Sequence, residues 1–291
     1  IAIVAVAMIG VMVPSVFAWN QAAIGMLELC TQYGSLDIKN KLCTLTKDVP
    51  YTILIEPRLN AIYTDEFIDH ESIISEWEKL DYDGISFEPT HNPYFPDSLF
   101  FDKFTVDGNG HTIAPTNEQC EISQSYTEAI LADGRWNGTV EGLSDKPDRL
   151  ILKNIRVDGN DWGCRADSAG NPLKILFGIN VGNGVTVIDS EIYATTQVGI
   201  TNTSGNALIK NNFIHDIKLN DSGWAVGIIS QGSQFKTIIE NNKILNTMIG
   251  ISATNVDISN NEIIDNEVGI NGDTSFGPGI ISNNIFKNNK I

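Results

Sequence analysis

The chain has 291 residues, of which 42% are hydrophobic, and its 36 acidic and 19 basic side chains give a net charge of −17. This apolar content excludes a disordered polyanion and is enough for one large domain or two small ones. The acidity argues against DNA or RNA as a partner, because proteins bind phosphate backbones mainly through Lys and Arg.

The first 18 residues carry no charge and end in Val16-Phe17-Ala18, a pattern typical of signal-peptidase cleavage before Trp19. We therefore expect residues 1–18 to be an incomplete signal peptide of an exported protein, lacking the initiator Met and the basic segment. The alternative is an uncleaved anchor, since 18 apolar residues are close to the length that spans a bilayer. No other stretch approaches that length, so no membrane contact is expected beyond this segment.

The four cysteines are consistent with export, because an even number in an exported chain predicts up to two disulfides. Three pairings are open, and we expect Cys30 with Cys43 and Cys120 with Cys164. A zinc site fits less well, because no two cysteines have the C-x2-C spacing and no His lies beside them, so no metal site is predicted here. The glycosylation acceptor pattern occurs at Asn137, Asn202 and Asn220, although an Asn-rich chain produces such matches easily by chance.

A repeat dominates the second part of the chain. Residues 178–291 contain 19 Asn and 22 Ile, but six Lys and no Arg. The recurring unit is I-x-N-N-x-I, and an upstream Gly-Ile pair accompanies each copy. The copies begin at Ile209, Ile239, Ile258 and Ile281, degenerate copies begin at Leu152 and Ile188, and the Gly-Ile pairs begin at Gly178, Gly199, Gly227, Gly250 and Gly269.

A repeat of about 20 residues is too short for paired helices and fits one coil of a solenoid. Apolar and polar residues alternate within each unit, as in Val256, Ile258 and Ile263, which predicts β-strands. Asn tolerates the left-handed backbone conformation, so each Asn pair is expected to form a corner between two strands. Stacked coils would then pair their strands in parallel about 4.8 Å apart, with the corners aligned in columns.

These repeats resemble those of the pectin-lyase-like superfamily. The sequence V-D-G-N occurs at residues 106–109 and 157–160, and residues 106–113 are similar to the opening coil of such proteins. The resemblance covers about residues 101–291 and implies an all-β fold, a right-handed parallel β-helix. It implies no single activity, because the superfamily includes polysaccharide lyases, glycoside hydrolases, epimerases and noncatalytic adhesins.

Residues 19–100 precede the repeats and differ from them. Within Asp69–Leu80 the apolar residues recur at helical spacing after an acidic first turn, which predicts a helix. Because a solenoid needs a cover over its end, we expect this region to be a small α/β N-terminal cap. The repeats stop at Ile291 just past a corner, so we expect the β-helix of residues 101–291 to be truncated at its C-terminal end.

The enzymes that these repeats resemble act in a groove along one outer face. Lyases stabilise an anion there, and glycosidases place two carboxyls about 5–10 Å apart. The outward residues expected after the Gly-Ile pairs carry no charge: Asn180, Thr201, Ile229, Ser252 and Asn271. The Asp-Asp and Gly-His-Gly elements of pectin hydrolases are absent too, and no Arg follows Arg165.

His215 and Asp216 have the composition of a catalytic dyad. Neighbouring residues on a strand point to opposite faces, however, so we expect these two side chains to diverge. Alignment of the repeats places His215 level with Ala194, Leu245, Ile264 and Lys287, a position that accepts any residue type. We therefore interpret His215 as an exposed residue at a strand end.

The residues expected just before the corners alternate in charge through the first four coils. They are Lys153, Asp189, Lys210, Glu240, Ser259 and Ser282. Opposite charges on neighbouring strands contribute about 0.2–1 kcal/mol per pair. We interpret the column as a stabilising ladder and not as a site.

Residues 157–174 leave the repeat and supply the best candidate site. Long loops on a rigid scaffold collect binding residues, and a Trp among carboxylates can stack on a sugar ring. The catalytic candidates are Asp158 and Asp161, as acid/base groups or Ca²⁺ ligands, and Arg165 as a charge clamp; the substrate-binding candidates are Trp162, Asp107 and His111. The alternative is an Asp-Gly turn in a disulfide-tied loop, in which the Asp side chains bond their own backbone.

The sequence therefore predicts a secreted or cell-surface protein that interacts with polysaccharide or another cell-surface glycan. One hypothesis is a polysaccharide lyase or glycoside hydrolase; the other is a noncatalytic adhesin-type solenoid with a long polar face. Neither requires a cofactor, and Ca²⁺ is compatible with the first. We expect a monomer.

Overall fold

The computed structural model describes residues 23–37, 39–55, 103–115, 128–132, 149–160, 162–166, 172–174, 177–202, 206–218, 223–231, 237–273 and 279–291. For Trp162, Cys164 and Arg165 it describes the backbone only. Several predictions concern residues outside these ranges: the signal segment 1–18, the helix at residues 69–80, Cys120, Asp161, Asn137 and Asn220.

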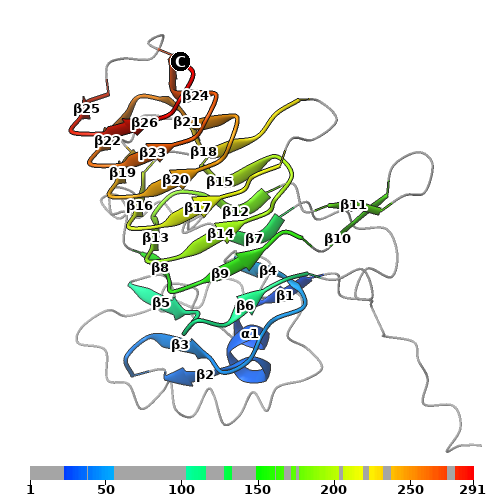
Figure 1. Ribbon diagram of the computed structural model, residues 1–291. Helices are drawn as coiled ribbons and strands as arrows, with labels where there is room; N and C mark the ends of the chain where they lie inside the picture. The colour runs from blue at the N-terminus through cyan, green and yellow to red at the C-terminus, as the bar shows by residue number, and fades with distance from the viewer. Residues whose placement is uncertain are drawn as a thin grey trace, which may run out of the picture.

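Most described elements are strands. The strands of successive coils lie side by side and form three large sheets that run along the stack (Figure 1). In the described residues sheet A has eight strands, sheet B nine and sheet C seven. Along the stack, sheet A contains β1 (Ala23–Gly25), β4 (Thr52–Ile55), β7 (Glu128–Ala132), β12 (Phe177–Val181), β15 (Val198–Asn202), β18 (Val226–Gln231), β21 (Ile249–Thr254) and β24 (Val268–Asp273). Sheet B contains β2 (Gly34–Asp37), β3 (Leu42–Leu45), β5 (Phe104–Asp107), β8 (Leu150–Lys153), β13 (Val185–Ile188), β16 (Ala207–Lys210), β19 (Thr237–Glu240), β22 (Val256–Ser259) and β25 (Ile281–Ser282). Sheet C contains β6 (Thr112–Ile113), β9 (Arg156–Asp158), β14 (Glu191–Tyr193), β17 (Phe213–His215), β20 (Lys243–Leu245), β23 (Glu262–Ile264) and β26 (Ile285–Lys287).

Each coil contributes one strand to each sheet, in the order A, B, C. Strands β12, β13 and β14 form one coil, and β15, β16 and β17 pair with them in parallel as the next coil. Equivalent apolar residues stack inside, as Ile179 beside Ile200 and Ile192 beside Ile214 show, and all four are fully buried. The predicted all-β fold of stacked parallel strands is confirmed, and its coils are those of a β-solenoid.

The Asn pairs form the corners between sheets B and C, as predicted. The first Asn of each pair adopts the left-handed conformation, with φ of 56° at Asn211, 56° at Asn241, 57° at Asn260 and 55° at Asn283. The backbone N–H groups of the first three donate to the carbonyl oxygens of the residues just before the corner in the next coil, which are Glu240, Ser259 and Ser282. The four corners therefore lie in one column.

The second Asn of each pair joins the coils through its side chain. The Oδ1 of Asn242 accepts from the backbone N–H of Asn212 at 2.9 Å and from its Nδ2 at 3.0 Å. Asn242 donates in the same way to Asn261, and its Nδ2 also donates to the carbonyl oxygen of Ile209. These three Asn side chains are buried, so the ladder provides partners for polar groups that would otherwise be buried without any.

The registers correct two of the sequence alignments by one residue. Ile188, and not Asp189, pairs with Lys210, while Asp189 takes the left-handed corner position with φ of 52°. Tyr193, and not Ala194, lies level with His215. The cause is that Ile188 is apolar but only half-buried, so an alignment on apolar residues shifts this coil by one position.

The charge column is interrupted, because Ile188 and not Asp189 occupies the position between Lys153 and Lys210. Lys210 Nζ lies 2.8 Å from Glu240 Oε1 in the next coil, which confirms that pair. Lys153 Nζ lies 4.0 Å from Asp107 Oδ2, so Asp107 belongs to the same column.

The glycines of the Gly-Ile pairs lie where sheet A begins, and the stack leaves no room for a side chain there. A Cβ on Gly227 would lie 2.6 Å from the carbonyl oxygen of Gly250 in the next coil and 2.6 Å from Cγ2 of Ile244. A Cβ on Gly199 or Gly250 would lie 2.6–2.7 Å from the equivalent carbonyl oxygen and Ile Cγ2 of its own neighbours. The recurrence of Gly thus reflects close contact between coils.

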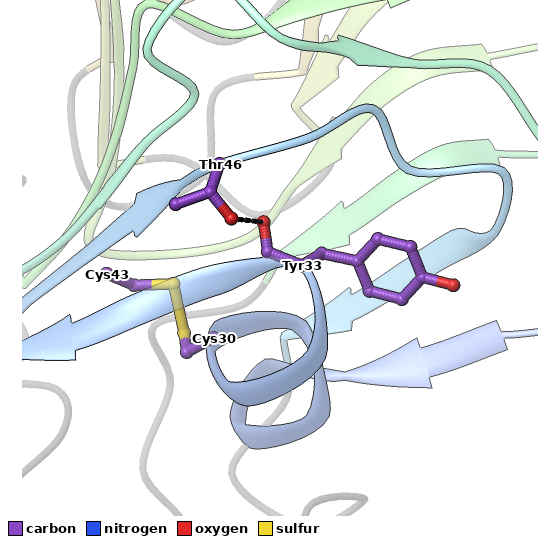
Figure 2. The surroundings of a disulfide bond; sticks show 4 residues. All are labelled: Cys30, Tyr33, Cys43 and Thr46. Carbon is purple, nitrogen blue, oxygen red and sulfur yellow. Dashed lines mark hydrogen bonds between the residues drawn. A yellow bond between two sulfur atoms is a disulfide. The ribbon is translucent and has the colours of Figure 1, made fainter.

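The N-terminal end carries α1 (Met26–Gln32), the only helix in the part of the chain that is described. Leu29 and Cys30 of α1 are buried in the core, and a disulfide joins Cys30 to Cys43 of β3 with a Cα–Cα distance of 5.4 Å (Figure 2). Beside it, the Oγ1 of Thr46 donates to the carbonyl oxygen of Tyr33. The predicted Cys30–Cys43 bond is confirmed, and the Cys120–Cys164 pair remains a prediction.

The strands near this helix already belong to the solenoid sheets. Strand β4 pairs in parallel with β7 in sheet A, and β3 pairs in parallel with β5 in sheet B, whereas β2 lies antiparallel to β3 at the edge. No helix in the described ranges is long and apolar enough to cross a membrane.

The predicted departure from the coil at residue 157 is too early, because Val157 and Asp158 still belong to β9 of sheet C and Val157 is fully buried. Strands β10 (Trp162–Ala166) and β11 (Pro172–Lys174) form an antiparallel hairpin that projects from the side of the stack (Figure 1).

Candidate functional site

The outer face of sheet C carries charged and aromatic side chains in two columns. Each three-residue strand buries its middle side chain and turns its first and third outward. The first column contains Arg156, Glu191, Phe213, Lys243 and Glu262, and the second contains Asp158, Tyr193, His215, Leu245 and Ile264.

His215 lies between two carboxylates. Its Nδ1 is 2.8 Å from Oδ2 of Asp216, and its Nε2 is 3.2 Å from Oε1 of Glu191. Both nitrogens donate at once only in the imidazolium form. Arg156 Nε lies 3.0 Å from the other oxygen of Glu191, so Arg156, Glu191, His215 and Asp216 form one network.

The expected divergence of His215 and Asp216 is therefore wrong. The alternation of side chains holds along a strand, but β17 ends at His215 and Asp216 has a left-handed φ of 54°. This backbone turn brings the carboxylate back beside the imidazole. The hydrogen bond from His215 and a second one from Asn246 lower the pKa of Asp216 below its usual value.

Aromatic rings stack along the same face. The His215 ring lies 5.3 Å from that of Tyr193 and 4.2 Å from that of Phe213, with interplanar angles of 5° and 24°. The Tyr193 hydroxyl donates to Oδ2 of Asp158 at 2.7 Å. Burial, together with this hydrogen bond and the negative charge of Asp158, raises the pKa of Tyr193 to about 12. Tyr193 is therefore a protonated donor at neutral pH.

A groove of about 380 Å³ begins next to this network. It follows the corner between sheets C and A across four coils, and we call it the corner groove. Its lining residues are Ile217, Ala225, Asn246, Thr247, Met248, Asp265, Asn266, Glu267, Asn288 and Lys290. Asn246 connects the two features, because its Nδ2 donates to Oδ1 of Asp216 at 2.6 Å.

Trp224 directly precedes Ala225, a lining residue of the corner groove, in the chain. Its side chain is 44% exposed, which is unusual for so large an apolar residue. The sequence analysis did not propose Trp224 as a site residue. The feature of the sequence that could have indicated Trp224 is its place at the end of an insertion, residues 218–224, which lengthens one coil.

The charged residues of the corner groove are bonded to neighbours. Lys290 Nζ lies 2.7 Å from Oε1 of Glu267, and Asn288 Nδ2 donates to Oδ1 of Asp265 at 2.9 Å. The lining of the groove therefore contains two carboxylates and one ammonium group. The amide oxygens of Asn246 and Asn288 are exposed acceptors, because the nitrogen of each amide is used in the bond to an Asp.

The predicted site residues occupy separate places. Asp158 lies on sheet C beside Tyr193, and its Oδ1 accepts from the backbone N–H of Asn160, as in the alternative Asp-Gly turn. Asp107 lies on sheet B and makes the same turn with Asn109. The two V-D-G-N sequences thus form different corners, and the structure does not bring Asp107 and Asp158 together.

His111 directly precedes β6, the strand of the preceding coil that pairs with β9, and its Nδ1 lies 3.4 Å from Oδ1 of Asp48. The backbones of Trp162 and Arg165 lie in β10 of the projecting hairpin, immediately after Asp158 and its turn. Their side chains and Asp161 lie outside what is described, so the roles predicted for them remain predictions.

Two further expectations concern modification and metals. Asn202 is fully buried, and its Nδ2 donates to Oγ1 of Thr237 at 2.7 Å, so the folded chain cannot be glycosylated there. Among the described residues, no group of three or more His, Cys, Asp and Glu side chains could hold a metal ion.

In comparisons with known proteins, no protein-family model matches the chain, and no curated protein or solved structure matches it significantly.

Proposed function

We propose that this chain is an extracellular right-handed parallel β-helix protein, similar to the pectin-lyase-like superfamily, that binds polysaccharide in the corner groove. The parallel coils and Asn corners support the fold assignment, and the Cys30–Cys43 disulfide supports an oxidising compartment.

The corner groove is the observation that carries the proposal. Its volume falls within the range of small-molecule sites, and its lining is mainly amides, a hydroxyl and carboxylates. Such groups exchange hydrogen bonds with sugar hydroxyls, and Trp224 offers a flat apolar surface for a sugar ring. The groove follows the stack, so it suits an extended polymer better than a compact metabolite.

The test is binding of the full chain to a panel of polysaccharides, with Trp224→Ala as the groove variant. Loss of the ring is expected to weaken binding by about tenfold, or about 1.4 kcal/mol. Asn271→Ala, on the exposed outer face of sheet A, is the matched control and should bind like the native chain. Thermal melts of both variants verify that they fold. Binding that neither variant changes would place the glycan site elsewhere.

Catalysis is a second candidate, favoured by the Glu191–His215–Asp216 network at the end of the corner groove. A positioned imidazolium could donate a proton to a glycosidic oxygen, with a carboxylate as its partner. New reducing ends or unsaturated products that disappear in His215→Ala would establish an enzyme. Binding without product formation supports the noncatalytic solenoid.

A further inference from the structure

We infer that the corner groove selects uncharged glycans and excludes uronates and sulfated sugars. This inference rests on the proposed function, which it deepens by naming the class of ligand. A polyanionic sugar needs cations that are free to clamp its carboxylates or sulfates, so the positions of the cations decide the question.

In the part of the chain that the structure describes, the cations near the corner groove are already engaged. From residue 178 onward the chain has no Arg. Lys290 in the groove lies 2.7 Å from Glu267, and Lys287 just outside it lies 2.7 Å from Glu262. Lys218 donates to Oδ1 of Asn160 at 2.9 Å, and Lys243 lies over the Phe213 ring, 5.4 Å from its centroid. A polyanion would have to displace one of these contacts.

The remaining charge of the groove is negative. Its lining contains the carboxylates of Asp265 and Glu267 but only one ammonium group, that of Lys290. Asn288 bonds Asp265 but does not neutralise it. In the network that adjoins the groove, Arg156 and His215 already contact the carboxylates of Glu191 and Asp216. An anionic sugar would therefore meet like charge in the groove, and the net charge of −17 would slow its approach.

Uncharged sugars meet none of these penalties. The exposed amide oxygens of Asn246 and Asn288 can accept from sugar hydroxyls, and the carboxylate of Asp265 between them is a stronger acceptor. These three residues belong to one corner column, so their acceptors recur along the direction in which an extended glycan would lie.

The experiment titrates the full chain with uncharged polymers (laminarin, mannan and xyloglucan), with polygalacturonate and alginate, and with dextran sulfate. We expect at least one uncharged polymer to bind the native chain, and to bind Trp224→Ala at least tenfold more weakly. We expect the native chain to bind the anionic polymers at least tenfold more weakly than it binds that uncharged polymer. Binding of polygalacturonate, alginate or dextran sulfate that Trp224→Ala abolishes would overturn this inference and leave the proposed function intact. Failure of every polymer to bind would overturn the proposed function itself.

A charge variant separates electrostatic exclusion from a poor fit of shape. Glu267→Gln keeps the shape of the side chain but releases the Lys290 ammonium group from its partner. Binding of polygalacturonate should then become at least tenfold tighter than to the native chain. Glu240→Gln removes a carboxylate from a lysine pair on sheet B, away from the groove, and should give no such gain. An unchanged affinity in Glu267→Gln would contradict the inference.

Discussion

The two Asn residues of each corner have different physical roles. The first, such as Asn241, is exposed and has φ of 56°, a conformation that Asn and Gly tolerate better than other residues. The second, such as Asn242, is buried and satisfies polar groups of its neighbours through its amide. A substitution at each position should therefore have a different cost.

Asn242→Ala should lower the free energy of unfolding by at least about 2 kcal/mol, because it removes the acceptor of the buried backbone N–H of Asn212 and the side-chain donor to the carbonyl oxygen of Ile209. Asn241→Gly should change it by less than about 1 kcal/mol, since Gly adopts positive φ readily. Urea denaturation followed by circular dichroism measures both. Equal effects of the two substitutions would contradict the assignment of the roles.

Asp216 makes stability depend on pH. Because its folded pKa lies below the usual 3.8, the carboxylate contributes stability above the unfolded pKa and loses it as pH falls through the folded pKa. Asp216→Asn should therefore lower the thermal midpoint at pH 7, and the difference from the native chain should close as the pH falls through the folded pKa, which lies below the usual 3.8. Asn suits the backbone, since Asn246 and Asn288 hold the equivalent positions with φ of 55°.

Asp189→Asn is the control for this effect. Asp189 has the same left-handed conformation and accepts from Asn211, and it contacts no imidazole in the described part of the chain. If the difference in thermal midpoint between the native chain and Asp216→Asn persists unchanged at low pH, the carboxylate charge is not the source of that difference.

At the residue scale the sequence predicted the corners but not the dyad. The Asn pairs were predictable because a left-handed position selects few residue types. The contact between His215 and Asp216 was not, because it depends on where β17 ends, and strand ends are not marked by the pattern of apolar residues. The shift between Ile188 and Asp189 has the same origin.

At the scale of the elements, the Gly-Ile pairs show how far a repeat predicts structure. Their spacing indicated where each strand of sheet A begins, and the registers confirm that one column contains Asn180, Thr201, Ile229, Ser252 and Asn271, although Thr201 is buried. The reason for Gly lies in the neighbouring coil, which a single repeat does not contain. Helix α1 was not predicted, because seven residues are too few for a clear helical period.

Gly227→Ala should destabilise the fold by about 1–3 kcal/mol, because its Cβ would collide with the backbone of the next coil and with Ile244. Gly272→Ala is the matched control, since its Cβ would have its nearest contact at 4.0 Å. Thermal unfolding of the two variants compares them. A Gly227→Ala chain as stable as Gly272→Ala would contradict the close contact between coils.

At the scale of the whole molecule, the corner groove arises only when the coils stack. Its residues come from four coils whose separation in sequence varies with the insertions between them. The sequence therefore predicted the solenoid but placed the candidate site on the loop after Asp158, where Trp162 and charged residues are adjacent in sequence. Trp224 stands alone in its loop, and its position beside the groove requires the registers of sheets A and C.

The alignment of the coils is the claim on which the corner groove depends, and the distance between two spin labels tests it most directly. Arg156 and Ile285 lie on the outer face of sheet C, five strand spacings apart along the stack. Nitroxides attached at Arg156→Cys and Ile285→Cys, after replacement of the native cysteines, should show a narrow distribution centred near about 24 Å. A broad distribution, or one centred beyond about 40 Å, would contradict the stacked solenoid, since five spacings of parallel strands cannot reach that far.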